Sequence, residues 1–461
     1  MAEHSSTRLL ISGHRFLKRR MAHALVRGDV RMLDDPLRSQ STAMVAGCVL
    51  AVIGVAVCAV LAFLQPRGSL GDTTVVMVRD SGALYVRVDD TWHPVPNLAS
   101  ARLVAGAVTP RLVNAAAVAG ARRGPAVGIP GAPDMIAAPL SAEQSGWQVC
   151  DDAASTTLIV GRDQAPPAAS DSILVSARGE GGAATYLLYD GRRARVDLRS
   201  PAVVRALRLD SVVPQPVSRA LLDTLPEVPE IAAPSIPAAG QPGPAALHGI
   251  RVGTVIRVAR AGAAELHVVL ATGVQRIGEV AADLIRFSQS HGSREIVTVE
   301  PGVLGGVPTV DTLPVALFPA RPGTVTEPVV CARWRWSDET GAPDTAVTTA
   351  RAIPLHGATP VRLAQADESG ARVDQVTVTP GHSALVRAAG VSGDGARTGT
   401  RYLLTEEGVL YGVRDDEAAE RLGLSAPPVP APWPLLAHLP RGPELSVPEA
   451  SIARDTAGPT S

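Results

Sequence analysis

An uncharged stretch between residues 43 and 64 constrains the fold of this chain more than any other feature of its sequence. It reads AMVAGCVLAVIGVAVCAVLAFL, 22 residues in all. A helix of that length spans about 33 Å, enough to cross a hydrocarbon core of ~30 Å. A cleaved signal peptide would have a shorter leader and a small-residue cleavage site, whereas here 42 residues precede the stretch and Gln65-Pro66-Arg67 follows it. We therefore predict a transmembrane helix that remains part of the chain.

The distribution of charge predicts how this helix is oriented. Residues 1–42 contain eight basic and four acidic residues, a net charge of +4, and the rest of the chain carries −5, so the total is −1. Positive charge is retained on the cytoplasmic side of a membrane. We expect a single-pass protein of the plasma (inner) membrane, with a cytoplasmic N-terminus and about 395 extracytoplasmic residues. The neutral total argues against a nucleic-acid partner, because binding a phosphate backbone requires a basic surplus.

Small residues recur along one side of the predicted span. Gly47, Ala51, Gly54 and Cys58 follow steps of four, three and four, which places them on one stripe of a helix. Small side chains let two transmembrane helices approach closely, so this stripe is a candidate surface for helix packing. The alternative is that a chain rich in Ala and Gly contains such a stripe by chance.

The segment before the span has the pattern of a basic amphipathic helix. Ser12 is a candidate N-cap and Gly28 a candidate end of this helix. One side would carry the apolar residues Phe16, Leu17, Met21 and Leu25. A helix of this kind beside a membrane docks on a partner protein or lies on anionic lipid. Docking on a cytoplasmic partner is the favoured interpretation, and a solvated segment that only sets the topology is the simpler alternative.

The four cysteines divide between two environments. Cys48 and Cys58 lie within the predicted span, where they act as small apolar residues. Cys150 and Cys331 are the only pair outside it, where oxidation is permitted. We favour a structural disulfide between them, which would close a loop of about 180 residues. Two free, buried thiols are the alternative.

Self-comparison of the extracytoplasmic part reveals four related units. Each has a strand, a hairpin and a short helix, and the hairpins begin near residues 82, 185, 265 and 401. Their predicted turns are Asp89-Asp90, Asp190-Gly191, Thr272-Gly273 and Glu407-Gly408. The second and fourth units are each followed by LLxxLPxxPE[IL], at residues 221–231 and 435–445. Irregular spacing of the units excludes a simple solenoid or propeller.

These features predict an α+β protein: one transmembrane helix, then an elongated extracytoplasmic region of four small β-rich repeats around a disulfide-bridged central domain. The predicted divisions are 1–42 (cytoplasmic amphipathic segment), 43–64 (transmembrane helix), 70–119 (repeat 1), 120–168 (central domain, first half), 169–243 (repeat 2), 244–291 (repeat 3), 292–380 (central domain, second half), 381–450 (repeat 4) and 451–461 (disordered tail).

The residues associated with common catalytic chemistry do not occur in the required patterns. A P-loop needs a lysine after its glycines, and Lys18 is the only lysine in the chain. The ten histidines show no metal-ligand spacing. Acidic pairs such as Asp151-Asp152 and Asp415-Asp416 lie where turns and helix starts are expected. We therefore expect no catalytic residue, no metal site and no cofactor.

The N-terminal segment resembles the signature of the EccB family of actinobacterial type VII (ESX) secretion systems. The resemblance is carried by Thr7-Arg8, His14-Arg15-Phe16, Arg19-Arg20, Asp29-Val-Arg-Met32 and Asp35-Pro-Leu-Arg-Ser-Gln40, and it extends to the span, the four repeats and the two extracytoplasmic cysteines. It implies a hexameric inner-membrane complex with the EccC motor ATPase, EccD and EccE, near the mycosin protease. It also implies that Phe16, Leu17 and Leu25 face cytoplasmic partners and that Cys150–Cys331 is the family's disulfide.

These expectations make the chain a structural membrane component of an ESX complex that builds its extracytoplasmic assembly. Two other functions remain open at this stage. The family is sometimes described as an extracytoplasmic ATPase, which here would be an ATP hydrolase without a P-loop. Small repeated β-units also bind glycans, so a cell-wall-binding module is the third hypothesis.

Overall fold

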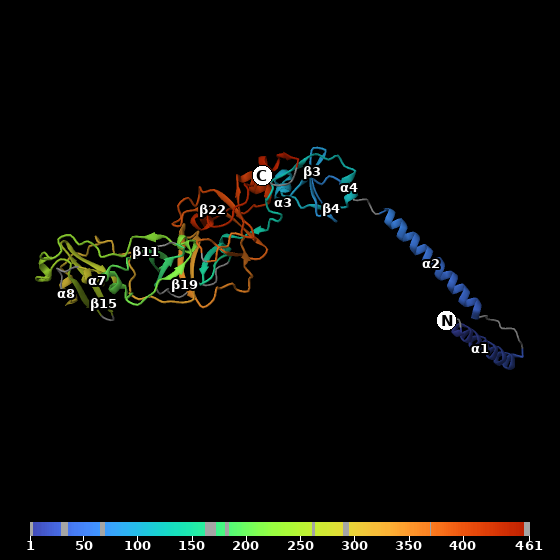
Figure 1. Cartoon of the computed structure of the whole chain (residues 1–461), viewed down its shortest axis with the longest axis horizontal. Coiled ribbons are helices and arrows are strands. Elements are labelled where there is room, and N and C mark those ends of the chain that lie inside the picture. Colours follow the sequence, from blue (N-terminus) through green and yellow to red (C-terminus); the bar gives the residue numbers. More distant parts are fainter. Residues whose placement is uncertain are drawn as a thin grey trace. The chain divides into compact units, whose positions relative to one another are not determined.

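The computed structural model describes residues 3–28, 36–64, 70–161, 172–179, 184–260, 263–288, 295–368 and 370–455. The chain divides into two compact units, residues 1–71 and 72–461. The first contains two helices, α1 (Glu3–Arg27) and α2 (Pro36–Leu64), shown in blue in Figure 1. The second contains all the strands of the described residues. The mixed α/β class predicted from the sequence is confirmed.

Helix α1 begins earlier than the sequence predicted. Ser12 lies inside it, and its hydroxyl donates a hydrogen bond to the Leu9 carbonyl oxygen (2.9 Å). Ser12 is therefore not an N-cap, because the nine residues from Glu3 to Ile11 already form helical turns that the apolar periodicity did not mark. Gly28 does end the helix: its φ is +66°, and its N–H bonds to the Ala24 carbonyl.

Four sheets in the second unit share one strand order. In each, an antiparallel three-stranded meander is followed by a helix and by a fourth strand that pairs, parallel, with the first strand. Repeat 1 contains β1 (Val75–Val78), β2 (Leu84–Val88), β3 (Thr91–Val95), α3 (Leu98–Ala105) and β4 (Arg111–Val113); repeat 2 contains β9 (Ile173–Ala177), β10 (Thr185–Tyr189), β11 (Arg192–Arg195), α5 (Pro201–Leu207) and β12 (Gln215–Val217). Repeat 3 contains β14 (Val255–Arg260), β15 (Ala263–Leu270), β16 (Gly273–Ile277), α7 (Glu279–Ser288) and β17 (Val297–Val299); repeat 4 contains β22 (His382–Ala389), β23 (Arg401–Leu404), β24 (Leu410–Val413), α9 (Asp416–Leu422) and β25 (Val429–Pro432).

Local sequence explains several hairpins and helix starts. Asp190 and Gly191 both have positive φ, 44° and 69°, as a tight two-residue hairpin turn requires. Asp415 accepts a hydrogen bond from the Ala418 N–H and so caps α9. Two turns differ from the prediction. Leu270 pairs with Gly273, so the third turn lies one residue earlier, and Leu404 pairs with Leu410, so the fourth is a five-residue loop.

A six-stranded central sheet unites segments that are far apart in the sequence. Its order is β19-β18-β7-β8-β21-β20. The strands are β7 (Gly146–Asp151), β8 (Thr156–Gly161), β18 (Val329–Ser337), β19 (Ala342–Ala350), β20 (Val361–Arg362) and β21 (Gln375–Val378). Trp147 and Trp334 are paired across β7 and β18 and are fully buried. This sheet is the central domain that repeats 2 and 3 interrupt.

Three predicted boundaries need correction. Strand β17 completes the sheet of repeat 3, and Leu313 and Val315 pack in the same core, so repeat 3 continues well past residue 291. Val127 packs in the core of repeat 1, beyond residue 119. β26 (Ala453–Arg454) pairs with β5 (Ala126–Val127), within the predicted tail; residues 456–461 lie outside the described part. In each case a short strand forms because it pairs with a strand that is distant in sequence. The residues of the short strand do not by themselves predict that pairing.

The remaining elements are short. They are α4 (Ala115–Ala119), β6 (Ala138–Pro139), a 3₁₀ turn (Ala142–Gln144), α6 (Arg219–Asp223), β13 (Glu227–Val228), a second 3₁₀ turn (Ala245–Leu247), α8 (Pro301–Leu304), α10 (Trp433–Leu436) and α11 (Val447–Ala450).

Candidate membrane anchor and assembly surfaces

Helix α2 has the length and composition of a membrane span. Residues Gln40–Val60 form an apolar window of 21 residues, none of it buried by the described protein. A soluble core helix of this composition would be covered by neighbouring elements, because exposed apolar surface is unfavourable in water by roughly 25 cal/mol per Å². Lipid is the environment in which a helix that is apolar all round is stable.

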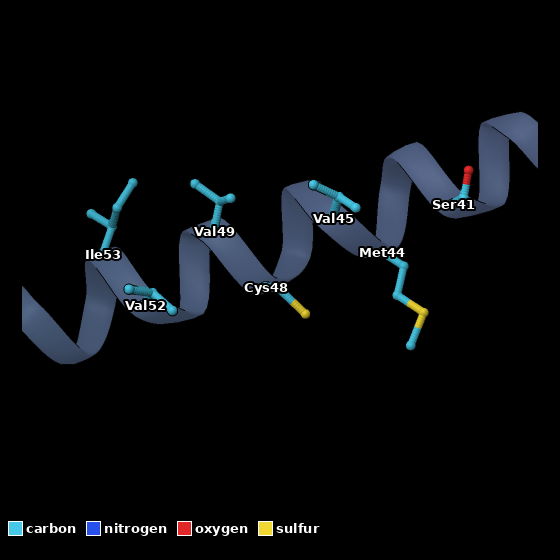
Figure 2. A pocket seen from close by; sticks show the side chains of 7 residues that line it. All are labelled: Ser41, Met44, Val45, Cys48, Val49, Val52 and Ile53. Carbon is cyan, nitrogen blue, oxygen red and sulfur yellow. The ribbon is translucent and has the colours of Figure 1, made fainter.

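The two sides of α2 differ in side-chain size. The small-residue stripe of Gly47, Ala51, Gly54 and Cys58 is exposed throughout. Nothing lies within 4 Å of a Cβ built on Gly47 or Gly54, so the described structure supplies no packing partner for this stripe. Another side carries larger apolar residues. Figure 2 shows Val45, Val49 and Ile53 along one edge of it and Met44 and Val52, with the smaller Cys48 between them, along the other.

The predicted docking face of α1 is open to solvent. Phe16 is half-buried, whereas Leu17, Met21 and Leu25 are exposed by 58%, 64% and 88%. Their positions at 100° per residue place all four within one half of the helix circumference. Arg15 and Arg19 lie on the opposite half and are also exposed. The amphipathic arrangement therefore exists, and its apolar side has no cover within the described residues.

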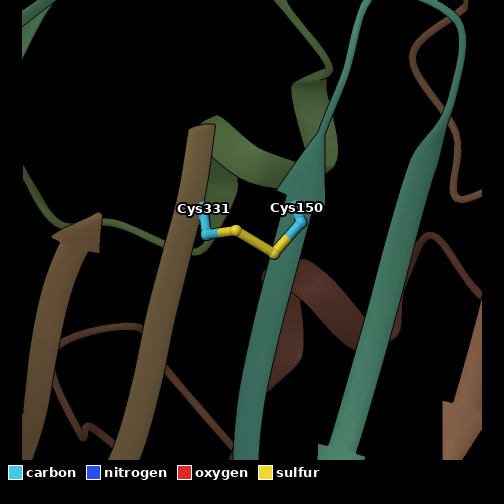
Figure 3. Close-up of a disulfide and its surroundings, with 2 residues drawn as sticks. All are labelled: Cys150 and Cys331. Carbon is cyan, nitrogen blue, oxygen red and sulfur yellow. A yellow bond between two sulfur atoms is a disulfide. The ribbon is translucent and has the colours of Figure 1, made fainter. Parts of the chain in front are cut away.

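Cys150 and Cys331 form a disulfide, drawn in Figure 3. They are directly opposite each other in the register of β7 and β18, with Cα atoms 4.0 Å apart. Both are buried and pack against Val329. The two cysteines are 181 residues apart, and the loop that the bond closes contains β8 and the whole of repeats 2 and 3.

Helices pair the repeats two by two. α3 of repeat 1 packs on α9 of repeat 4, and α5 of repeat 2 packs on α7 of repeat 3. In the first pair, Arg102 donates to the Leu422 carbonyl oxygen (3.0 Å) at the end of α9. Arg421 donates to the Leu103 and Val104 carbonyl oxygens (3.2 and 3.0 Å) at the end of α3. Each arginine thus satisfies carbonyls that the partner helix leaves unpaired at its C-terminus.

The pairing of repeats 2 and 3 uses a buried tyrosine. The Tyr189 hydroxyl donates a hydrogen bond to the Leu317 carbonyl oxygen (2.6 Å). Burial raises the pKa of Tyr189 to about 12, so this hydroxyl keeps its proton at any physiological pH. Arg208 and Glu279 add an exposed ion pair between the same two repeats (3.0 Å).

The two copies of the duplicated LLxxLPxxPE motif meet in the central core. α6 lies in the first copy and α10 in the second, and they pack together with Leu221, Leu222, Leu435 and Leu436 fully buried. This contact was not predicted, although the duplication itself was the sequence signal that could have indicated it.

Asp223 forms a polar cluster beside that contact. Its carboxylate accepts hydrogen bonds from Arg193 (3.2 Å) and Arg219 (3.1 Å) and lies 3.1 Å from His438 Nε2. Burial alone would raise the pKa of Asp223, but the hydrogen bond with His438 and the two guanidinium groups outweigh it, and the net pKa is lowered. The carboxylate is therefore ionised, and its hydrogen bond with His438 links the two motif copies.

The pKa of Asp151, next to the disulfide, is shifted in the opposite direction to that of Asp223. It is fully buried, and its carboxylate accepts from the Ser218 N–H. Burial raises the pKa of Asp151, and the nearby Arg178 guanidinium only partly opposes that rise. Its bond to Ser218, the N-cap of α6, gives it a role in positioning that helix.

The described residues contain no group of three or more His, Cys, Asp or Glu side chains placed to hold a metal ion. The acidic pair Asp151-Asp152 is used structurally: Asp151 binds the Ser218 backbone, and Asp152 accepts from the Ala154 and Ser155 N–H groups in a turn. Asp415 caps α9, and Asp416 pairs with Arg401 (2.9 Å).

Comparison with known proteins decides the family. Residues 3–459 match the family described as "Type VII secretion system ESX-1, transport TM domain B". The chain belongs to the EccB family. It is 36% identical to the "ESX-5 secretion system ATPase EccB5" of Mycobacterium tuberculosis, over 98% of this chain and 94% of that protein. It is 34% identical to the "ESX-3 secretion system ATPase EccB3" of Mycolicibacterium smegmatis, over 97% and 91%.

Solved structures of EccB proteins have the same fold. The chain superposes with a TM-score of 0.71 on a chain of an intact ESX-5 inner membrane complex, at 33% identity and over 98% of this chain and 96% of that chain. A structure of the EccB3 dimer from the ESX-3 core complex gives a TM-score of 0.70 at 30% identity, over 83% and 100%. This EccB protein is a structural membrane component of a type VII secretion system, with a large extracytoplasmic part.

Proposed function

We propose that this EccB chain is a scaffold that spans the inner membrane once through α2, with residues 1–42 in the cytoplasm and the repeats outside. The observation that carries the proposal is the exposed apolar window Gln40–Val60 of α2, which separates a segment of net charge +4 from a region of net charge −5. Retention of the positive side in the cytoplasm sets this orientation.

The proposal includes association with other ESX components and with further copies of the chain. Its support is the likeness to a chain of the ESX-5 inner membrane complex and to the EccB3 dimer. We propose the family's partners, the EccC motor ATPase, EccD, EccE and the mycosin protease, and a hexameric arrangement. Within the membrane, the stripe of Gly47, Ala51, Gly54 and Cys58 would pack against another span, because these residues allow close backbone approach.

On the cytoplasmic side, the apolar face of α1 would dock on a partner. Its support is the exposure of Leu17, Met21 and Leu25, which would be costly in a helix permanently surrounded by water. Burying one such side chain stabilises a complex by about 1.5–3 kcal/mol.

Detergent extraction tests this docking. The complex is purified through a tag on the chain, and the double variant Phe16→Asp/Leu17→Asp should recover at least tenfold less of the other components. The matched control is Ala22→Asp/Val26→Asp, which adds the same two charges at exposed positions on the opposite half of the helix. Full co-purification of the Phe16/Leu17 variant would show that this face does not dock.

The relatives are named ATPases, and that activity is the competing function for this chain. We propose that the chain itself does not hydrolyse ATP and has no cofactor. The support is chemical: its one lysine, Lys18, lies before the membrane span, so no P-loop can form in the repeats. ATP hydrolysis that follows the purified chain through every column, and that one point mutation abolishes, would contradict the proposal.

A further inference from the structure

Repeat 3 has a charged groove beside α7 that its fold does not require. The groove has a volume of about 670 Å³ and runs between α7, the strands β14–β16 and the segment around Ala320 and Arg321. Leu266, Ile277 and Ile296 contribute apolar surface to it, and charged side chains supply the rest of the lining. The Ala320 carbonyl oxygen accepts the Glu279 N–H (3.0 Å), which holds Arg321 next to the start of α7.

The charges of this groove do not cancel. Its three carboxylates each have an arginine partner, in the pairs Arg276–Glu265 (3.7 Å), Arg286–Asp283 (2.9 Å) and Arg208–Glu279 (3.0 Å). Arg257 and Arg321 are exposed, and among the residues that the structure describes neither has an ion-pair or hydrogen-bond partner for its side chain. The lining alone has four arginines and three carboxylates, a net charge of +1, and Arg208 neutralises Glu279 from outside the groove. Arg257 and Arg321 are therefore two uncompensated guanidinium groups.

Arg257 is not needed by the repeat. It lies two residues after Val255, a buried residue of the first strand that packs in the core under α7. In repeat 1 the same relation leads from Val75 to Met77, in repeat 2 from Leu174 to Ser176, and in repeat 4 from Leu385 to Arg387. Arg387 donates to the Gly399 carbonyl oxygen within its own repeat (3.2 Å), whereas the exposed Arg257 side chain makes no such bond among the described residues.

We propose that this groove binds the phosphate group of an extracytoplasmic ligand. A guanidinium presents paired N–H donors that match phosphate oxygens, so two of them from separate segments can grip one phosphate. A phosphate monoester carries about −1.5 to −2 at neutral pH, which complements the two uncompensated guanidinium groups. The apolar residues of the groove can contact the less polar part of a phosphorylated organic molecule. The phosphate that binds would therefore be either part of a phosphorylated carbohydrate or free phosphate.

Calorimetric titration of the full-length chain in maltoside detergent, which contains no phosphate, tests the proposal. Inorganic phosphate and glucose 1-phosphate are added at low salt and pH 7. We expect both to bind, the sugar phosphate more tightly if the ligand is a phosphorylated carbohydrate and equally if it is free phosphate. Each lost charge-assisted contact weakens binding about tenfold, so Arg257→Gln/Arg321→Gln should weaken it about 100-fold. The conservative variant Arg257→Lys/Arg321→Lys retains the charge and should lose less than Arg257→Gln/Arg321→Gln does.

The matched control is Arg205→Gln/Arg351→Gln, which removes two exposed arginines outside the groove and should leave binding unchanged. All four positions are at the surface, so the thermal unfolding of each variant should stay close to that of the parent chain. Absence of binding by the parent chain at 10 mM of either probe (roughly 100-fold weaker than a 100 µM site) overturns the proposal. Equal weakening by the control pair overturns it too, because that result would mean a diffuse response to net charge.

Discussion

The disulfide allows the sharpest quantitative prediction. Replacing both Cys150 and Cys331 by Ala removes a crosslink between residues 181 apart. In the chain-entropy model, a closed loop of that length lowers the entropy of the unfolded chain by about 18 cal/mol/K, which corresponds to roughly 5 kcal/mol at 25 °C. This is near the upper end for a single disulfide, because the loop includes the whole of repeats 2 and 3.

Urea unfolding followed by tryptophan fluorescence measures the loss of unfolding free energy in the central sheet. Trp147 and Trp334 are buried in the two strands that the disulfide joins, so their emission reports on the central sheet. With a slope of about 2–3 kcal/mol/M, the midpoint of that transition should fall by roughly 2 M in the Cys150→Ala/Cys331→Ala variant.

The membrane cysteines provide the matched control. Cys48→Ala/Cys58→Ala removes two thiols that are not crosslinked, and it should leave the midpoint unchanged. A reductant should shift the control to the midpoint of the Cys150/Cys331 variant and leave that variant unaffected. A loss below about 1 kcal/mol would refute the reasoning, since it would mean that residual structure in the unfolded chain keeps Cys150 and Cys331 close without the crosslink.

Three further predictions concern contacts inside the extracytoplasmic unit. Arg421→Ala removes both hydrogen bonds to the end of α3, so the unfolding free energy should fall by about 1–3 kcal/mol and hydrogen exchange in repeat 1 should quicken; unchanged exchange in α3 would contradict this. Because the folded pKa of Asp223 is lowered, its stabilising effect is present above the unfolded pKa of about 4 and is lost as pH falls through the folded value. Asp223→Asn should therefore flatten the acid limb of the stability–pH curve, and an identical limb would count against the cluster. Gly191→Ala places a Cβ against the Thr345 carbonyl oxygen at a φ of 69°, so the unfolding free energy should fall by at least about 1 kcal/mol and the melting temperature by at least about 1 °C; an unchanged melting temperature would argue against that close approach.

The four hairpins show how far local pattern reaches. Alternation of apolar residues around an Asp-Asp or Asp-Gly pair predicted the first two turns correctly, since such turns depend only on adjacent residues. The fourth strand of repeat 3 was missed, because β17 has only three residues and forms by parallel pairing with β14, about 40 residues earlier. The sequence of such a short strand does not indicate a parallel partner that is connected to it through a helix.

Some of the candidate surfaces could be predicted from the sequence, and others could not. The small-residue stripe of α2 and the apolar side of α1 follow from helical periodicity, so the sequence predicted both, and whether they bind partners stays a prediction. The Asp223 cluster could not be predicted: it joins the two motif copies, and Asp223 in the first copy has no acidic counterpart in the second. The charged groove of repeat 3 likewise depends on Arg257 and Arg321, which only the fold brings to one cavity.

The sequence by itself determined what depends on neighbouring residues or on total composition: the apolar helix long enough to span a membrane, the first two hairpin turns and the availability of one cysteine pair. Tertiary structure alone decided which helices pair, where each sheet ends, that Cys150 and Cys331 face each other in register, and which charges are left without partners. The physical reason is that burial and register arise from segments that meet across as many as 328 residues, as Ala126 and Arg454 do. The energy of such a contact belongs to both segments together and is not visible in either one alone.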